Sequence, residues 1–292
     1  MKYLISGDNH LRSDQPICFT GDQDEWQAFQ ESVMNFLVNT ANSYKAGILF
    51  PGDLTDVPRV PNEIMAMFFR AMSRHNGESF TLAGNHSLPH HREANVFNSS
   101  VGLIKALNHN RIHYCDSVEE LIDGRFEHSH RLNDEITMVH TLCFEREEDI
   151  HFAFNAVTAD YLLEKYDTPY IICADMHTPF VYRKNGRAVV NSGKMTVQTV
   201  SEMDKPPICY LLDTDTGSIT EIALPHDPSK VSNEHITKKK EYDESLESAI
   251  KLLQEVGDDT TLDYVANLMV YCDKNKASLE ARDIINEIRE EK

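Results

Sequence analysis

Five short clusters of acidic, histidine and asparagine residues are the parts of this sequence that could do chemistry, and each follows an apolar run. The clusters are Asp8-Asn9-His10, Gly52-Asp53-Leu54-Thr55-Asp56, Gly84-Asn85-His86, Val139-His140-Thr141 and Ala174-Asp175-Met176-His177. Carboxylate, imidazole and amide groups are ligands of divalent cations. A pair of such cations at one site would suit hydrolysis of a phosphate ester.

Each cluster taken alone has an ordinary explanation. Asp-x-His is more often a turn that carries a surface pair, and a lone histidine at a strand end, such as His140, is more often hydrogen-bonded within the fold. In extended backbone, however, Asp8 and His10 point the same way and could converge on one ion. Gly52 lets the backbone approach a site closely, and Asp53 is placed to bridge two ions. Five clusters in succession therefore predict a metal site.

The apolar runs before the clusters predict strands, and helical periodicity lies between them. The predicted strands are 2–6, 46–50, 79–83, 136–139 and 170–173, and the predicted helices are 26–44, 62–74 and 158–166. This alternation is typical of βα units, in which functional sites gather at the carboxyl ends of the strands.

Beyond residue 173 the pattern changes to antiparallel hairpins. Residues 180–182 and 188–191 flank Asn185-Gly186, which favours a tight turn. Residues 209–213 and 218–224 flank Asp215-Thr216-Gly217 in the same way.

Composition shifts near Pro225, and we predict two domains with bounds 1–230 and 231–292. The second segment shows three apolar helical faces, at 246–256, 262–269 and 279–288. These helices would either pack on the first domain or dock a partner protein.

Bulk properties exclude several classes of protein. The chain has 292 residues, of which 41% are hydrophobic and 26% charged, as in a folded globular protein. No apolar stretch is long enough to span a membrane and no signal peptide is evident, so we expect a cytoplasmic protein without membrane contact. The six cysteines form no Cys-x-x-Cys pair, which favours reduced, buried thiols. The net charge of -19 argues against nucleic-acid binding unless metal ions, local basic groups or a partner help.

The order and spacing of the five clusters resemble the calcineurin-like metallophosphoesterases, whose motifs are Asp-x-His, Gly-Asp-x-x-Asp/His, Gly-Asn-His, a lone His and Gly-His-x-His. The resemblance covers roughly residues 1–225. It implies an α/β fold, a four-layer αββα metallophosphoesterase sandwich, here with a short helical C-terminal appendage.

The resemblance also implies roles for individual residues. One metal would be bound by Asp8, His10 and His177, the other by Asn85, His140 and Asp175, and Asp53 would bridge both. His86 corresponds to the catalytic histidine of the family. The implied cofactors are two divalent ions, Mn²⁺ first, with Mg²⁺, Fe²⁺ or Zn²⁺ as alternatives.

A narrower resemblance is to SbcD-type DNA-repair nucleases, including phage relatives. It is carried by His177-Thr178-Pro179, Val190-Asn191-Ser192-Gly193, Tyr210-Leu211-Leu212-Asp213 and Glu221-Ile222-Ala223-Leu224-Pro225. It implies a manganese-dependent DNA exonuclease or endonuclease subunit of an SbcCD-like repair and recombination complex. DNA would be the substrate, an SbcC-type coiled-coil ATPase the partner, and a homodimer is a further assembly that it allows.

Two departures from the family pattern keep other functions open. Asp175 stands where the family has histidine, and Ser87 stands where Gly-Asn-His is usually followed by Asp. A carboxylate at position 175 would favour manganese or magnesium, or else weaken the second site. The segment after Val231 is short for the DNA-capping domain of the family's nucleases. The alternatives are a phosphodiesterase for a small nucleotide or other compact ester, and a non-catalytic interaction protein with a decayed site.

Overall fold

The computed structural model describes residues 1–107, 109–122, 125–150, 156–234 and 264–275, and the single positions 236, 246 and 282. The chain divides into two compact units, Met1–Asn233 and Glu234–Lys292. In the second unit the structure describes helix α6 (Tyr264–Asn275), which overlaps the helix predicted at 262–269. The helices predicted at 246–256 and 279–288 lie outside the described residues, apart from positions 246 and 282.

The first unit contains two six-stranded sheets, and the first of them is largely parallel. Its order is β14-β13-β1-β2-β3-β4, in which β1 to β4 are parallel and β13 runs antiparallel to β1. The strands are β1 (Lys2–Ile5), β2 (Gly47–Phe50), β3 (Ser79–Leu82), β4 (Ile112–Cys115), β13 (Ile208–Asp213) and β14 (Ser218–Ala223). The carboxyl ends of β1, β2 and β3 therefore lie at one edge.

The second sheet is mixed, with order β11-β12-β10-β7-β6-β5. Strands β7, β10 and β12 are parallel, whereas β5, β6 and β11 run antiparallel to their neighbours. The strands are β5 (Val118–Ile122), β6 (Arg125–Arg131), β7 (Ile136–His140), β10 (Tyr170–Ala174), β11 (Phe180–Lys184) and β12 (Arg187–Asn191). A short separate pair is formed by β8 (Cys143–Phe144) and β9 (Val157–Thr158).

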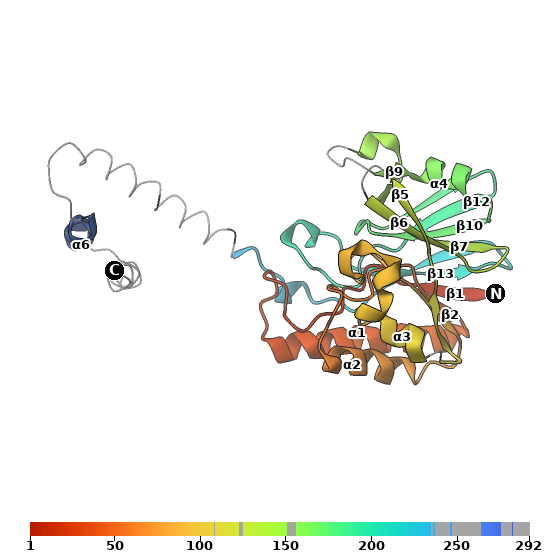
Figure 1. Ribbon diagram of the computed structural model, residues 1–292, viewed down its shortest axis with the longest axis horizontal. Helices are drawn as coiled ribbons and strands as arrows, with labels where there is room; N and C mark the ends of the chain where they lie inside the picture. The colour runs from red at the N-terminus through yellow and green to blue at the C-terminus, as the bar shows by residue number, and fades with distance from the viewer. Residues whose placement is uncertain are drawn as a thin grey trace. The chain divides into compact units, whose positions relative to one another are not determined.

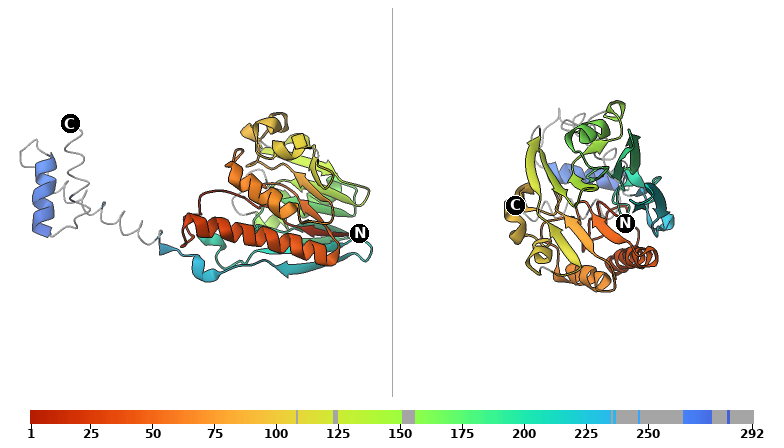
Figure 2. Two further views of the ribbon diagram at one scale, coloured as in Figure 1. Left: turned by 90° about the horizontal axis from the view of Figure 1, so that it is seen from below. Right: turned by 90° about the vertical axis from the view of Figure 1, so that its right-hand side faces the viewer.

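Helices cover the outer faces of both sheets (Figures 1 and 2). Helices α1 (Gln23–Tyr44), α2 (Asn62–Met72) and α3 (Gly102–Leu107) lie on the first sheet, and α4 (Ala159–Lys165) lies on the second. Helix α1 begins at Asp22, whose side chain accepts a hydrogen bond from the Glu25 amide at 2.8 Å, and it ends at Lys45 in the left-handed conformation. Glycine commonly occupies that last position, so here a lysine carries the strain.

Side-chain alternation along the strands explains the layers. In β1, Leu4 packs with the helices, whereas Tyr3 and Ile5 face the core between the two sheets. In β10, Ile172 faces that same inter-sheet core, whereas Ile171 packs in a separate core between the second sheet and α4. The four-layer αββα arrangement predicted for this α/β chain is confirmed.

The two predicted hairpins are also confirmed, and they extend different sheets. Asn185 and Gly186 have φ values of 52° and 76°, as a tight hairpin turn requires, and join β11 to β12 in the second sheet. The other hairpin, β13 and β14, joins the first sheet beside β1.

All six cysteines are among the described residues, and each is a buried free thiol, as predicted. Within the described part of the chain, no helix is both long and apolar enough to cross a membrane.

Candidate metal centre

The two sheets bring the five polar clusters together at one edge of the first unit. Asp8, Asp53 and Asn85 follow β1, β2 and β3, which end side by side because these strands are parallel. His140 is the last residue of β7 and is opposite Ala174 at the end of β10, directly before Asp175. The clusters therefore meet although their residues lie far apart in the sequence.

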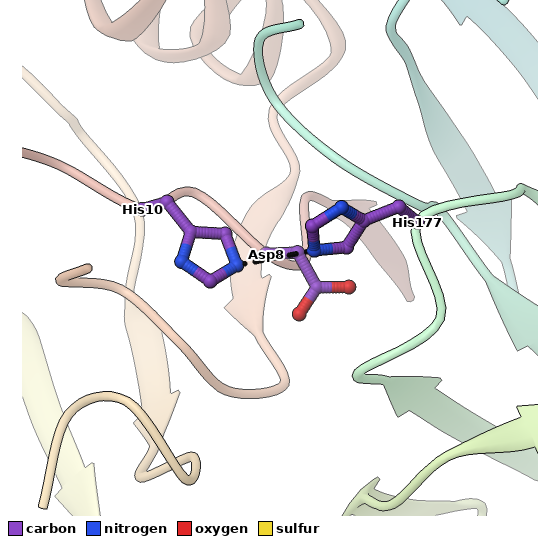
Figure 3. A group of neighbouring side chains, drawn as sticks. All are labelled: Asp8, His10 and His177. Carbon is purple, nitrogen blue, oxygen red and sulfur yellow. Dashed lines mark hydrogen bonds between the residues drawn. The ribbon is translucent and has the colours of Figure 1, made fainter. Parts of the chain in front are cut away.

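Asp8, His10 and His177 form the first ligand group (Figure 3). Their potential ligand atoms all lie within 4.8 Å of one another. His10 Nε2 is 3.2 Å from His177 Nε2, so the two rings turn their Nε2 atoms toward each other. Both carboxylate oxygens of Asp8 accept from the Asp175 amide at 3.1 Å, which ties the loop after β1 to the loop after β10.

The far side of each imidazole in this group faces a carboxylate. His10 Nδ1 is 3.1 Å from Asp56 Oδ1, and His177 Nδ1 is 2.6 Å from Glu202 Oε1. Arg12 holds Asp56 in turn, through a 3.1 Å ion pair. A carboxylate behind a histidine fixes the ring's orientation and leaves the other nitrogen for a metal.

Asp8, Asp53 and His140 form the second ligand group, again with ligand atoms within 4.8 Å of one another. His140 Nε2 is 3.2 Å from Asp53 Oδ2 and 3.8 Å from Asp175 Oδ1. His140 is completely buried, and neither of its ring nitrogens makes a well-aligned hydrogen bond to any described residue. Buried imidazole nitrogens of this kind, close to carboxylates, are what a metal ligand presents before the metal binds.

Asn85 and His86 lie directly beside Asp53. The His86 backbone amide donates to Asp53 Oδ1 at 2.8 Å. Asn85 is buried, and its backbone carbonyl oxygen is 2.7 Å from His91 Nδ1. The His86 ring is exposed and packs edge-on against His10, with ring centroids 4.9 Å apart. Its Nδ1 is 3.0 Å from the Asp56 carbonyl oxygen.

Four of the seven predicted ligands have a positive φ, a backbone conformation that residues other than glycine rarely adopt. The φ values are 41° at Asp8, 45° at His10, 45° at Asp53 and 92° at Asp175. Each such residue costs on the order of 1–3 kcal/mol, and strain of this kind concentrates at functional sites. The sharp turns at these positions aim side chains from several strand ends at one point.

Two glycines make room for the ligands. A Cβ atom at Gly52, where φ is 139°, would overlap the His140 ring. A Cβ atom at Gly84 would overlap Asp53. The predicted role of Gly52 in close backbone approach is confirmed.

Burial and mutual proximity shift the pKa values of the clustered groups. Burial raises the pKa of Asp8 to about 6, against the opposing effect of His140 and His10. Burial lowers the pKa of His140, but Asp53 and the other carboxylates outweigh it and raise the value to about 9. The protein without metal thus holds protons among these ligands, and a bound cation would displace them.

The donor set fits divalent cations. It combines three carboxylates, three imidazoles and the amide of Asn85, a mixture that suits manganese, zinc and iron, with magnesium favoured by the oxygen donors. Asp8 is common to both groups, whereas the family resemblance assigns the bridging role to Asp53. That role and the division of the ligands between two ions stay predictions.

The sequence interpretation missed the groups behind the histidines. Asp56 lies inside a quoted cluster and could have been assigned, because it stands three residues after Asp53 as the second acid of that motif. Glu202 is separated from His177 by the β11–β12 hairpin and an irregular segment, and it has no local signal. Only the fold brings it to His177.

Comparisons with known proteins give structural neighbours of low similarity. No protein-family model matches the chain, and no curated protein matches it. Among solved structures, an archaeal phosphodiesterase is 14% identical, with 77% of this chain and 100% of that chain covered and a TM-score of 0.42. The protein TT1561 of Thermus thermophilus is 12% identical, with 76% and 98% covered and a TM-score of 0.45. Vps29 of Entamoeba histolytica, complexed with Zn²⁺, is 11% identical, with 76% and 97% covered and a TM-score of 0.36.

Proposed function

We propose that this chain is a metal-dependent phosphoesterase that hydrolyses phosphodiester bonds. One observation carries the proposal: two ligand groups, Asp8 with His10 and His177 and Asp8 with Asp53 and His140, lie beside each other at the meeting edge of two sheets. Asn85 and Asp175 lie at the same edge and complete the proposed set of seven ligands.

These residues would hold two divalent cations, with Mn²⁺ the first candidate. When bound, the cations would supply Lewis acidity toward a phosphoryl oxygen and lower the pKa of a water molecule. The strained turns at Asp8, Asp53 and Asp175 keep the carboxylates in place before the substrate arrives, which avoids reorganisation during the reaction.

His86 is the proposed catalytic residue. Its exposed ring lies next to His10, and its Nδ1 proton is donated to the Asp56 carbonyl oxygen. That hydrogen bond leaves Nε2 as the nitrogen that takes up a proton and delivers it to the leaving oxygen. General acid catalysis of this kind contributes roughly 10²- to 10⁴-fold.

We further propose a DNA substrate and the role of a nuclease subunit that works with an SbcC-type ATPase and assembles as a homodimer in the cytoplasm. The narrower sequence similarity to SbcD-type nucleases in residues 177–225 supports this assignment. The C-terminal unit, which contains α6, is the proposed docking segment for the ATPase.

A compact phosphodiester is the second candidate substrate. The net charge of -19 disfavours a long polyanion. In addition, a cleft of about 550 Å³ is lined by Val57, Pro58 and Arg59, which follow Asp56 in sequence, and by Pro89, His90, Asn95 and Asn98. Its volume would accept a group the size of a nucleotide.

The test is manganese-dependent hydrolysis of bis(p-nitrophenyl) phosphate beside single- and double-stranded DNA, with wild type compared to His86→Ala. We expect the variant to lose about 100-fold or more in turnover and to keep its metal content. His130→Ala is the matched control, because His130 Nδ1 also lies on an aspartate carbonyl oxygen, that of Asp116 at 2.8 Å.

Each result separates the candidates. DNA cleavage that depends on His86 supports the nuclease, and cleavage of the small diester alone supports the compact substrate. Absence of hydrolysis together with absence of bound manganese would support a decayed site. Full activity in His86→Ala would overturn the role of His86.

A further inference from the structure

The irregular segment 192–202 makes hydrogen bonds to the backbone of residues 7 and 8 and to the His177 side chain, and so supports the first ligand group. Ser192 Oγ accepts a hydrogen bond from the Gly7 amide at 2.6 Å, and the Met195 amide donates to the Asp8 carbonyl oxygen at 3.2 Å. The same segment ends in the short helix η4 (Val200–Glu202), whose last residue reaches the site. One segment therefore fixes the backbone at Asp8 and supplies a side chain to the site.

That side chain is Glu202, and both of its carboxylate oxygens accept hydrogen bonds. Oε1 is 2.6 Å from His177 Nδ1. Oε2 accepts from the backbone amides of Gln198, at 2.9 Å, and Thr199, at 3.2 Å. The Glu202 side chain is 11% exposed, so these partners take the place of water.

Lys194 keeps Glu202 ionised. Its ammonium group, 2% exposed, lies 3.4 Å from Glu202 Oε2 and donates to the Glu202 carbonyl oxygen at 3.3 Å. All three groups around Glu202 Oε2, the amides of Gln198 and Thr199 and the Lys194 ammonium, can only donate, so this carboxyl group carries no proton of its own. An ionised carboxylate can only accept hydrogen bonds, so the proton between Glu202 and His177 belongs to Nδ1.

We propose that Glu202 is a positioning residue that fixes the tautomer of His177, with the proton on Nδ1 and the Nε2 lone pair directed at the metal site. The inference rests on the proposed metal-binding function of that site. Carboxylates behind metal-ligating histidines act in this way, and their loss typically costs about 10- to 100-fold in metal affinity.

The double hydrogen bonding of Glu202 makes glutamine a sharp probe. An amide has one accepting oxygen, and at position 202 that oxygen would stay with the two backbone amides and the Lys194 ammonium. The NH₂ group would then face His177 Nδ1 and donate to it. Glu202→Gln should therefore move the His177 proton to Nε2, where it competes with a metal. Glu202→Ala only removes the acceptor and leaves Nε2 free in part of the population.

The first measurement is the tautomer of His177 in the metal-free protein, from long-range ¹H–¹⁵N correlation spectra at pH 8. We expect a protonated Nδ1 in wild type and a protonated Nε2 in Glu202→Gln. Glu221→Gln, a change at an exposed glutamate of β14, should match wild type. An unchanged His177 tautomer in Glu202→Gln would overturn the proposal, whether or not the site binds metal.

The second measurement is Mn²⁺ affinity by calorimetric titration of the same variants. We expect a loss of about 10- to 100-fold in Glu202→Gln, larger than the loss in Glu202→Ala. If Glu202 only filled space, the isosteric glutamine would be the milder change, so the opposite order would overturn the proposal. Wild type that binds no Mn²⁺ would instead count against the metal centre, and the tautomer measurement would still decide the role of Glu202.

Discussion

The two ligand groups of the candidate centre are held by different means. In the first, His10 and His177 each have a carboxylate behind the ring, at 3.1 Å and 2.6 Å. In the second, His140 is fully buried, its Nδ1 has no hydrogen-bond partner among the described residues, and its ring lies against Gly52. The first pair of imidazoles is oriented by carboxylates, through a hydrogen bond at His177 and an ion pair at His10, whereas packing against Gly52 constrains His140. We therefore expect the first group to respond to loss of the carboxylates behind its rings, and His140 to respond also to a change of volume at Gly52.

Another buried histidine shows what an ordinary structural role looks like in the same fold. His75 lies between α2 and β3, before the start of that strand; its Nδ1 is 3.1 Å from Asn42 Oδ1, and burial lowers its pKa. Burial should lower the pKa of His140 as well, yet Asp53 and its neighbours raise it to about 9. The carboxylates around His140 thus distinguish it from a histidine that merely fills the core.

The largest effect should follow removal of the carboxylate that lies against His140. We expect Asp53→Ala to lower Mn²⁺ affinity by more than the roughly 100-fold seen when a supporting group is lost and to abolish hydrolysis. Metal content by atomic emission spectroscopy is the readout, and Asp134→Ala, at a fully exposed turn, is the control. Retention of two manganese ions in Asp53→Ala would refute a bridging role.

A change of volume should act on the second group alone. Gly52→Ala places a methyl group into the His140 ring, and we expect a loss of about 1–3 kcal/mol in the free energy of unfolding together with weaker binding of one ion. Gly186→Ala is the control, because Gly186 also has a positive φ but no atom of the described chain lies near its missing Cβ atom. Chemical denaturation and manganese titration measure both effects. Equal behaviour of the two variants would contradict orientation by packing.

A change of charge at the residue common to both groups should separate stability from binding. Asp8 is a buried carboxylate at a strained φ beside Asp53 and Asp175, so Asp8→Asn should raise the melting temperature of the metal-free protein. The stabilisation that excess Mn²⁺ confers should shrink in the same variant, since the cation loses a charged ligand. Thermal unfolding in EDTA and in Mn²⁺ gives both values. A lower melting temperature in EDTA would show that Asp8 serves the fold.

The smallest effect should be on the pH dependence of stability and should follow replacement of His75, a buried histidine outside the candidate centre. The folded-state pKa of His75 lies below its ordinary 6.5, so protonation favours the unfolded chain. The stability that His75 contributes is fully present above pH 6.5 and is lost as the pH falls through that value toward the folded-state pKa. His75→Gln should flatten this part of the stability profile, measured by urea denaturation from mildly acidic to mildly basic pH. His109→Gln, at an exposed position, should leave it unchanged.

Sequence periodicity was sufficient to predict the strands that position the candidate site. Strands β1, β2, β3, β7 and β10 are short apolar runs between polar clusters, and their predicted positions agree with the structure within a residue or so. The clusters themselves were visible because the candidate site at the strand ends is built from side chains that come immediately after each strand. Those local constraints leave a local signal.

Contacts between distant segments left no such signal. Strand β5 (Val118–Ile122) is mostly exposed and β6 carries histidine, serine and arginine, so neither shows the apolar pattern that predicts a strand. Both form because β6 pairs with β7 at the edge of a sheet already built. Glu202 was missed for the same reason, since its partner His177 is brought to it by tertiary structure alone.

The positive φ angles at Asp8, His10, Asp53 and Asp175 lower the stability of the fold at the residues that the proposed activity requires. Glycine or asparagine at these positions would relieve backbone strain, and loss of the buried carboxylates would relieve mutual repulsion. Laboratory evolution that selects for thermal stability alone should therefore accumulate substitutions at the centre and yield proteins with higher melting temperatures and no activity. The positions where such a selection removes acidic residues first would map the centre without any assay of its chemistry.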